Sequence, residues 1–136
     1  MSVEFVDTNI FVYAHDAASP QKRAQALELI GRLSAGRNGR VSTQVLLEFF
    51  AASRKIGLQR AVAAEIVEDL ISWPVYAPDV DDITMAIALS IRQTISVWDA
   101  LMIRSALQSG CDILWSEDMQ DRRRFGSLRV RNPFRA

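Results

Sequence analysis

The chain has 136 residues, and its 16 basic and 16 acidic side chains give a formal net charge of zero. Hydrophobic residues make up 49% of the sequence, which is enough to form the core of one domain of this length. Because Cys111 and His15 are the only residues of their types, the composition excludes an intrachain disulfide and a metal site built from several Cys or His ligands.

The chain also lacks the sequence features of secreted and membrane proteins. Its first residues have no basic segment followed by a long apolar run, as a signal peptide would. No stretch approaches the roughly 20 apolar residues of a membrane-spanning helix. We therefore expect a cytoplasmic protein without a membrane partner.

The charges are unevenly distributed along the chain. Residues 122–136 contain six arginines and no acid, so the preceding residues carry a compensating excess of six acids (ten basic against sixteen acidic side chains). Such asymmetry suggests an anionic partner or a neighbouring chain, although a solvated basic tail is an equally good interpretation.

Apolar periodicity and helix-capping signals divide the chain into alternating strands and helices. Ser19 followed by Pro20 is a helix start, Ser96 is placed to cap another helix, and Gly57 and Gly110 are typical helix ends. In chain order, we predict a strand at 3–6, an apolar segment at 10–14, a helix at 20–35, a turn at 36–39, an extended segment at 40–42, a helix capped by Thr43 and ending near 56, a helix at 59–73, a strand at 74–77, helices at 79–93 and 97–108, a strand at 112–115 and a last edge strand at 129–130.

This alternation predicts an α/β fold, in which helices pack on both faces of a mostly parallel sheet. The sequence shows no internal repeat and no linker, so we expect a single domain over residues 1–136.

Asp99 is an acid where the local pattern favours an apolar residue. Apolar residues lie three, four, seven and eight positions after it, which are the spacings of one helix face. Asp99 should therefore face the core side from the first helical turn. Because desolvating an unpaired carboxylate is costly, something must compensate its charge. A helix N-terminus alone would contribute only about 0.3–1 kcal/mol.

Three further acids are candidates on weaker grounds. Glu48 lies only about 60° from Val45 on a helical wheel, so it borders the apolar face, although the pattern alone favours a rim Glu that reaches solvent. Asp7 and Asp118 both follow predicted strands, where ligands of open α/β sheets bind. The alternatives are a helix cap at Asp7 and a surface turn at Asp118.

Together the four acids predict a cluster at one edge of the sheet. Like charges in close proximity repel one another unless a cation neutralises them. Without His or Cys ligands, the expected ion is a hard cation such as Mg²⁺, and Mn²⁺ would also fit. Such a site suits hydrolysis of a phosphodiester.

The same residues carry a resemblance to a known family. The chain resembles the PIN-domain ribonucleases, and most closely the VapC toxins of prokaryotic toxin–antitoxin pairs. The matching segments occur in the same order and at similar spacing over essentially the whole chain. They are residues 5–9 (FVDTN), residues 42–49 (STQVLLEF), residues 98–100 (WDA) and residues 116–120 (SEDMQ).

The resemblance implies a three-layer α/β/α sandwich and magnesium-dependent cleavage of RNA. It implies that Asp7, Glu48, Asp99 and Asp118 form the catalytic metal site, and that the polar neighbours Thr8, Asn9 and Ser116 orient these acids or touch the substrate. It also implies a homodimer and a VapB-type antitoxin that blocks the site. Two alternatives stay open: a PIN-like binding module that does not cut RNA, and an RNA-processing nuclease that has no antitoxin.

The sequence departs from the family pattern after Asp118. The family often has a glycine shortly after this point, whereas here Asp121 precedes three arginines and the next glycine is Gly126. We therefore expect a differently shaped loop, whose arginines contact either RNA phosphates or an acidic antitoxin segment.

The remaining unusual residues have simpler interpretations. The single His15 is expected to be exposed, and Cys111 to be a small buried residue. The three tryptophans are expected in the core or at a dimer contact, with stacking on RNA bases as the alternative.

Overall fold

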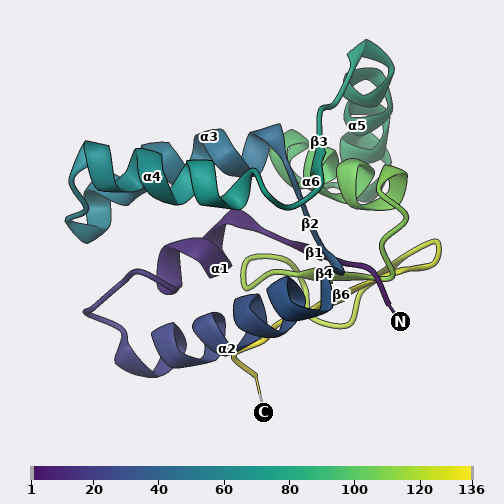
Figure 1. Ribbon diagram of the computed structural model, residues 1–136. Coiled ribbons are helices and arrows are strands. Elements are labelled where there is room, and N and C mark those ends of the chain that lie inside the picture. The colour runs from purple at the N-terminus through teal and green to yellow at the C-terminus, as the bar shows by residue number, and fades with distance from the viewer. Residues whose placement is uncertain (1, 136) are drawn as a thin grey trace.

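The computed structural model describes residues 2–135, which form one sheet with helices on both faces (Figure 1). The strands follow the order β3-β2-β1-β4-β6-β5, and all neighbours are parallel except β5 and β6. Their bounds are β1 (Glu4–Val6), β2 (Gly39–Ser42), β3 (Val75–Tyr76), β4 (Ile113–Trp115), β5 (Arg124–Phe125) and β6 (Leu128–Arg131).

The helices complete a three-layer α/β/α sandwich, as expected. Figure 1 shows α2 on one side of the sheet and α3, α4 and α6 on the other, while α5 stands outward next to α6. The bounds are α1 (Thr8–Tyr13), α2 (Pro20–Gly36), α3 (Thr43–Ala52), a 3₁₀ turn η1 (Ser53–Ile56), α4 (Arg60–Leu70), α5 (Val80–Gln93) and α6 (Val97–Gln108).

The central strand β1 organises the core. It lies between β2 and β4, and all three of its residues are buried. Phe5 is fully buried together with Leu114 of β4 and Val130 of β6, on the same side of the sheet. A strand that is paired on both sides and covered on both faces ends at a fixed point, which makes the residue after it a well-defined position.

Several predicted boundaries need correction. The helix predicted to run from Thr43 to about residue 56 gives way at Ser53 to the 3₁₀ turn, and its N-cap is Ser42, whose hydroxyl accepts from the Val45 N–H. The predicted helix at 59–73 ends at Leu70. The apolar segment after Asp7 is the short helix α1.

The predicted last edge strand is wrong in its position. β6 lies inside the sheet, because it pairs with β4 on one side and with β5 on the other. The edge is β5, a two-residue strand that is too short to produce a periodic pattern in the sequence.

No single helix in the described part of the chain is long and apolar enough to cross a membrane. Helices α5 and α6 meet that criterion only as a pair, and they are bent by 119° where they join.

A buried acid fixes α5 against α6. Asp82 is 1% exposed and accepts hydrogen bonds from the Tyr76 hydroxyl (2.6 Å) and from Nε of Arg104 on α6 (2.8 Å). Asp82 also accepts from the Asp79 N–H as half of a capping box at the start of α5. The Tyr76 hydrogen bond, helped by those from Asp79 and Arg104, lowers the pKa of Asp82 to about 2 despite its burial.

Replacing Asp82 should therefore destabilise the protein much more than replacing its neighbour Asp81. Asp82→Ala leaves Arg104 and the Tyr76 hydroxyl without their partner and removes one of the two hydrogen bonds of the capping box, and we expect a loss of about 2–4 kcal/mol in the free energy of unfolding. Asp81→Ala, at an exposed position of the same helical turn, is the matched control. Urea denaturation measures both, and equal losses in the two variants would contradict the role given to Asp82.

Candidate active site

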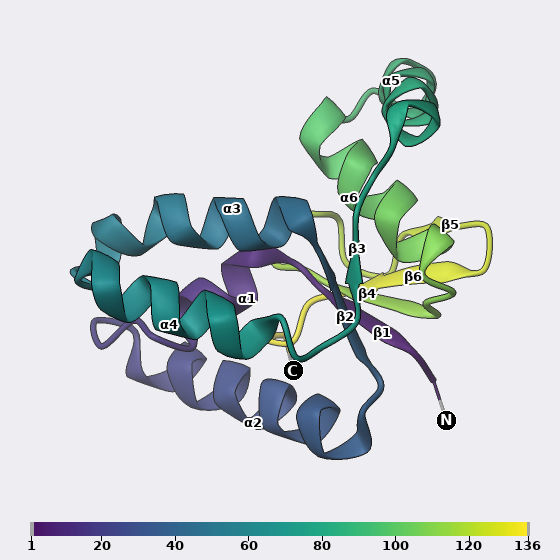
Figure 2. The same ribbon diagram turned by 45° about the horizontal axis from the view of Figure 1, so that its top comes forward.

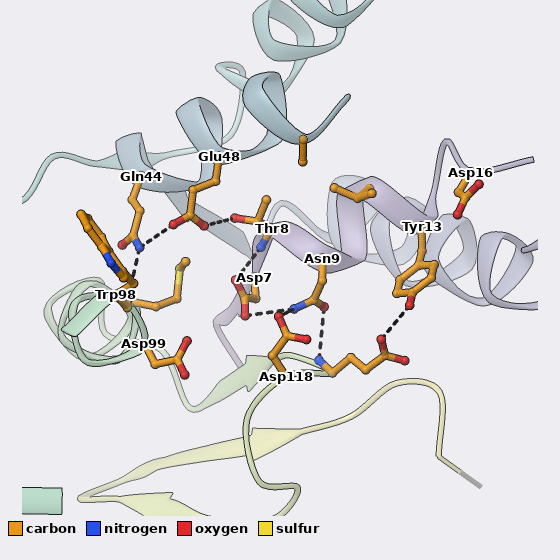
Figure 3. A pocket seen from close by; sticks show the side chains of 14 residues that line it. Asp7, Thr8, Asn9, Tyr13, Asp16, Gln44, Glu48, Trp98, Asp99 and Asp118 are labelled. Atoms are coloured by element: carbon orange, nitrogen blue, oxygen red, sulfur yellow. Dashed lines mark hydrogen bonds between the residues drawn. The ribbon is translucent and has the colours of Figure 1, made fainter. Parts of the chain in front are cut away.

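A pocket of about 500 Å³ opens where the parallel strands β1 and β4 end. Six acids line it, and no Lys, Arg or His is among the described residues of its lining. These acids come from the segments just before and after α1, from α3, from α6 and from the loop after β4, and Figure 3 shows their side chains around the pocket. The acids are Asp7, Asp16, Glu48, Asp99, Glu117 and Asp118.

Asp7 is the most deeply buried of these acids, at 5% exposure. It follows β1 and caps α1, since its Oδ1 accepts from the Thr8 N–H (2.6 Å). Its Oδ2 accepts from the Ser116 hydroxyl (2.7 Å) and from the Asn9 amide (3.2 Å). The backbone N–H of Asp7 donates to the Trp115 carbonyl (2.9 Å), so this position is tied to the end of β4.

Burial is the main reason that the pKa of Asp7 rises to about 7. The charges of Asp118 and Glu48 raise it further, while the hydrogen bonds from Ser116 and Thr8 oppose the rise. The carboxyl group thus lies in a site that disfavours its negative charge and that a bound cation would relieve.

Glu48 faces the pocket from the second turn of α3, as the family resemblance implied. Its Oε1 accepts from the Thr8 hydroxyl (2.8 Å) and its Oε2 from the Gln44 amide (2.9 Å) (Figure 3). The same Gln44 amide lies 3.2 Å from the Trp98 carbonyl, so α3 and the start of α6 are linked above the pocket.

Asp99 and Asp118 complete the acidic lining. Asp99 is half-buried in the first turn of α6, and its backbone N–H donates to the capping hydroxyl of Ser96 (3.0 Å). Burial raises its pKa, and the charges of Asp118 and Glu48 add to the rise. Asp118 is exposed and accepts from the Asn9 amide (3.1 Å), which also reaches Asp7.

The structure therefore brings all four predicted acids and their three polar neighbours to one place. Thr8 bridges to Glu48, while Asn9 connects Asp7 with Asp118. The Ser116 hydroxyl donates to Asp7 and accepts from the Asp118 N–H (3.2 Å). Each polar neighbour thus orients one or two acids. Both oxygens of Asp7 and of Glu48 accept hydrogen bonds, but each acid keeps at least one oxygen lone pair for a ligand or water.

The donor set fits a hard cation held partly through water. Within residues 2–135, no three Asp, Glu, His or Cys side chains lie close enough to bind one ion directly. Mg²⁺ retains several waters and needs only one or two carboxylates, so the pocket meets its requirements. Asp7 and Asp99 are the acids whose pKa values burial raises, and they are the first candidates for direct ligands.

Some pocket residues escaped the sequence analysis. Tyr13, Asp16, Gln44 and Glu117 line the pocket from its ends. Gln44 could have been predicted from the sequence, since it lies four residues before Glu48 and therefore on the same helix face. The Tyr13 hydroxyl donates to Glu117 (2.8 Å), a contact between segments far apart in the chain that no local pattern indicates.

The expectation for His15 needs correction, whereas the exposure of Trp98 excludes only a place in the core and leaves a dimer contact or stacking on RNA bases open. Trp98 is 64% exposed at the pocket rim, outside the core, whereas Trp73 and Trp115 are partly buried against it. His15 is half-buried, with its ring edge-on to Phe49 at 5.8 Å, rather than exposed. Cys111 is buried, as expected.

The loop after Asp118 turns at Arg122. This residue adopts φ 68°, in the left-handed region that favours glycine, so an arginine stands at a turn position where glycine would be less strained. Its N–H donates to the Val130 carbonyl (2.7 Å), which fixes the loop against β6.

Asp7 should make the metal-free protein less stable as the pH rises. Because its pKa is raised from 3.8 to about 7 by folding, the stabilising effect of its proton is complete below pH 3.8 and is lost as the pH passes about 7. From about pH 5 to about pH 8, this loss corresponds to about 2–3 kcal/mol of unfolding free energy.

Urea denaturation in EDTA across this range measures the effect. Asp7→Asn should flatten the dependence on pH, since Asn does not titrate, while the exposed control Asp69→Asn should keep the wild-type slope. Parallel wild-type and Asp7→Asn curves would contradict the assignment.

Solved structures with the same fold include toxins and toxin–antitoxin complexes. VapC20 of Mycobacterium tuberculosis, described as a sarcin-ricin loop cleaving toxin, is 23% identical, with a TM-score of 0.62 over 85% of this chain and 91% of that chain. A toxin–antitoxin complex from Klebsiella pneumoniae is 18% identical, with a TM-score of 0.70 over 99% and 100%. DNA-bound VapBC from Salmonella typhimurium is 17% identical, with a TM-score of 0.69 over 98% and 99%.

Comparison with curated proteins gives no match. The sequence itself matches the PIN domain family over residues 5–126, a range that holds all four pocket acids predicted from the sequence. Since this match spans most of the chain, the protein belongs to the PIN domain family.

Proposed function

We propose that this chain is a magnesium-dependent endoribonuclease and the toxin of a VapBC-type toxin–antitoxin pair. The observation that supports this most is the convergence of four carboxylates, from four separate segments, in a pocket whose described lining has no basic side chain. Asp7 is held there in a buried position that raises its pKa, which is typical of groups selected for chemistry and not for stability.

The roles of the residues follow from their positions. Asp7 and Asp99 would hold the principal ion, Mg²⁺ or Mn²⁺, and Asp118 and Glu48 would complete the site directly or through water. A divalent ion supplies a more acidic water and neutralises charge on the phosphate. Glu48 can accept a proton from a water in the pocket, because Thr8 and Gln44 fix the direction of its carboxylate.

The proposed partners rest on the structural relatives and on exposed apolar surface. VapC20 is described as a toxin that cleaves the sarcin-ricin loop, the structure from Klebsiella pneumoniae is a toxin–antitoxin complex, and that from Salmonella typhimurium is VapBC bound to DNA. We extend to this chain an RNA substrate, a VapB-type antitoxin, a homodimer and a cytoplasmic location. Helix α5 exposes Val80 (80%), Met85 (52%) and Ile91 (77%), an apolar surface of the kind that protein partners cover.

RNA cleavage by the purified protein is the direct test. We expect cleavage with Mg²⁺, none in EDTA, and a loss of about 100-fold or more for Asp7→Asn or Asp99→Asn, because each change removes a charge that holds the ion. Glu48→Gln should also lose activity, whereas Asp69→Asn, a remote exposed acid, should keep it.

Cleavage that survives both EDTA and Asp7→Asn would refute this mechanism. RNA that is bound but never cut would favour the non-catalytic binding module. Cleavage that no antitoxin encoded beside the gene inhibits would favour an RNA-processing nuclease.

Metal binding can be tested without activity. Because Mn²⁺ or Mg²⁺ binds the folded pocket and not the unfolded chain, millimolar ion should raise the melting temperature by an amount that corresponds to about 1–3 kcal/mol. Asp99→Asn should reduce this shift and Asp69→Asn should not. An identical shift in wild type and Asp99→Asn would argue against a metal site at this pocket.

A further inference from the structure

A second charged surface lies on the strands next to the acidic pocket. Arg129 and Arg131 alternate with the buried Leu128 and Val130 along β6, so their side chains project from one face of the sheet. In Figures 1 and 2 the hairpin of β5 and β6 reaches past the end of α2, which leaves this face without a helix. Four arginines line a groove of about 390 Å³ there: Arg122, Arg124, Arg129 and Arg131.

The arginines of this groove (the arginine groove) lack compensating charge. No acid lines the groove, and none of the four forms an ion pair with any acid in the described part of the chain. The Arg131 side chain lies near the Trp115 ring, with 5.9 Å from its guanidinium carbon to the ring centroid, and its buried Nε has no hydrogen-bond partner. A buried donor without a partner costs free energy, so stability does not account for an arginine at this position.

Local structure does not explain why arginines occupy these positions. Arg124 lies directly opposite Arg129 in the antiparallel pair, and like charges placed this way are destabilising. Arg122 adopts the left-handed conformation, which costs a non-glycine residue roughly 1–2 kcal/mol. The groove therefore concentrates positive charge at some expense to the fold, as expected of a site that binds an anion.

The groove and the acidic pocket share one structural connection. The Ser116 N–H donates to the Arg131 carbonyl (2.9 Å), and the Ser116 hydroxyl donates to Asp7 (2.7 Å). The short loop from Ser116 to Arg122 runs from the pocket to the groove, with Asp118 on it. A chain of phosphates that reaches the pocket can therefore also reach the groove around the carboxyl ends of β4 and β6.

Binding of RNA, which is a polyanion, also requires a positively charged surface such as the arginine groove. The pocket itself is lined by six acids, so it repels phosphates, and the net charge of the whole chain is zero. Attraction for RNA must come from a separate cationic region, because phosphate contacts supply most of its sequence-independent affinity. Bound cations in the pocket would offset only part of the repulsion.

We propose that the arginine groove binds the phosphate backbone of the RNA substrate, several nucleotides away from the bond that is cut. This proposal rests on the proposed ribonuclease function but concerns a different surface. It assigns to the arginines at the end of the chain the task of anchoring RNA, while the acids carry out the chemistry.

The test measures binding apart from cleavage. A fluorescent single-stranded RNA is titrated with the full chain in EDTA, at a series of salt concentrations, for wild type and for the double variant Arg124→Gln/Arg129→Gln. Losing two phosphate contacts should weaken binding about tenfold or more at low salt and reduce the slope of log K against log salt by about 1.4. The double variant Arg54→Gln/Arg92→Gln, which removes two exposed arginines elsewhere, should keep the wild-type slope.

Several outcomes would overturn the proposal. Equal slopes for groove and control variants would refute it, as would a groove variant that is less stable to urea than wild type. Polyglutamate that binds as tightly as RNA, and loses affinity with the same variants, would assign the groove to an acidic protein segment instead. If the protein binds RNA through the groove but does not cleave it, the proposed ribonuclease function is refuted, while the proposed role of the groove stands.

Discussion

The burial of one carboxylate at the end of the central strand is the constraint on which the rest of the structure depends. Asp7 is 5% exposed and lies near two other negative charges, and both burial and those charges raise its pKa to about 7. A fold that needed only stability would place an apolar residue there. Keeping the acid requires hydrogen bonds from three neighbours, and those neighbours in turn determine how β1, α1 and β4 meet.

The fold supplies these compensations through the starts of its helices. Asp7, Ser42 and Ser96 cap α1, α3 and α6, and the first turns of these helices lie at the pocket. The positive ends of the helix dipoles partly offset the acidic charges. A parallel sheet makes this arrangement possible because its strands end at the same edge, where the following helices begin.

The charges of the molecule are separated in space as well as in sequence. Acids gather in the pocket, and four of the six arginines that follow Asp121 gather on the open face of β5 and β6. A neutral chain thus presents two strongly charged surfaces of opposite sign, joined through Ser116. In a ribonuclease of the proposed kind, this separation lets one surface attract the phosphates while the other holds the ion that acts on one of them.

The sequence by itself determined the fold class, the order of most elements and the identity of four of the six pocket acids. Asp99 stood out because helical periodicity is local and makes an acid on an apolar face visible, and its neighbours Asp7 and Asp118 followed from their places after strands. Glu48 depended mainly on family resemblance, since its position on the helix by itself favours a side chain that reaches solvent. Only the tertiary structure decided that β5 forms the sheet edge, that Trp98 lies at the rim, that Tyr13 meets Glu117 and that four arginines share one groove. These features arise from contacts between distant segments and from a two-residue strand, and neither leaves a periodic trace in the sequence.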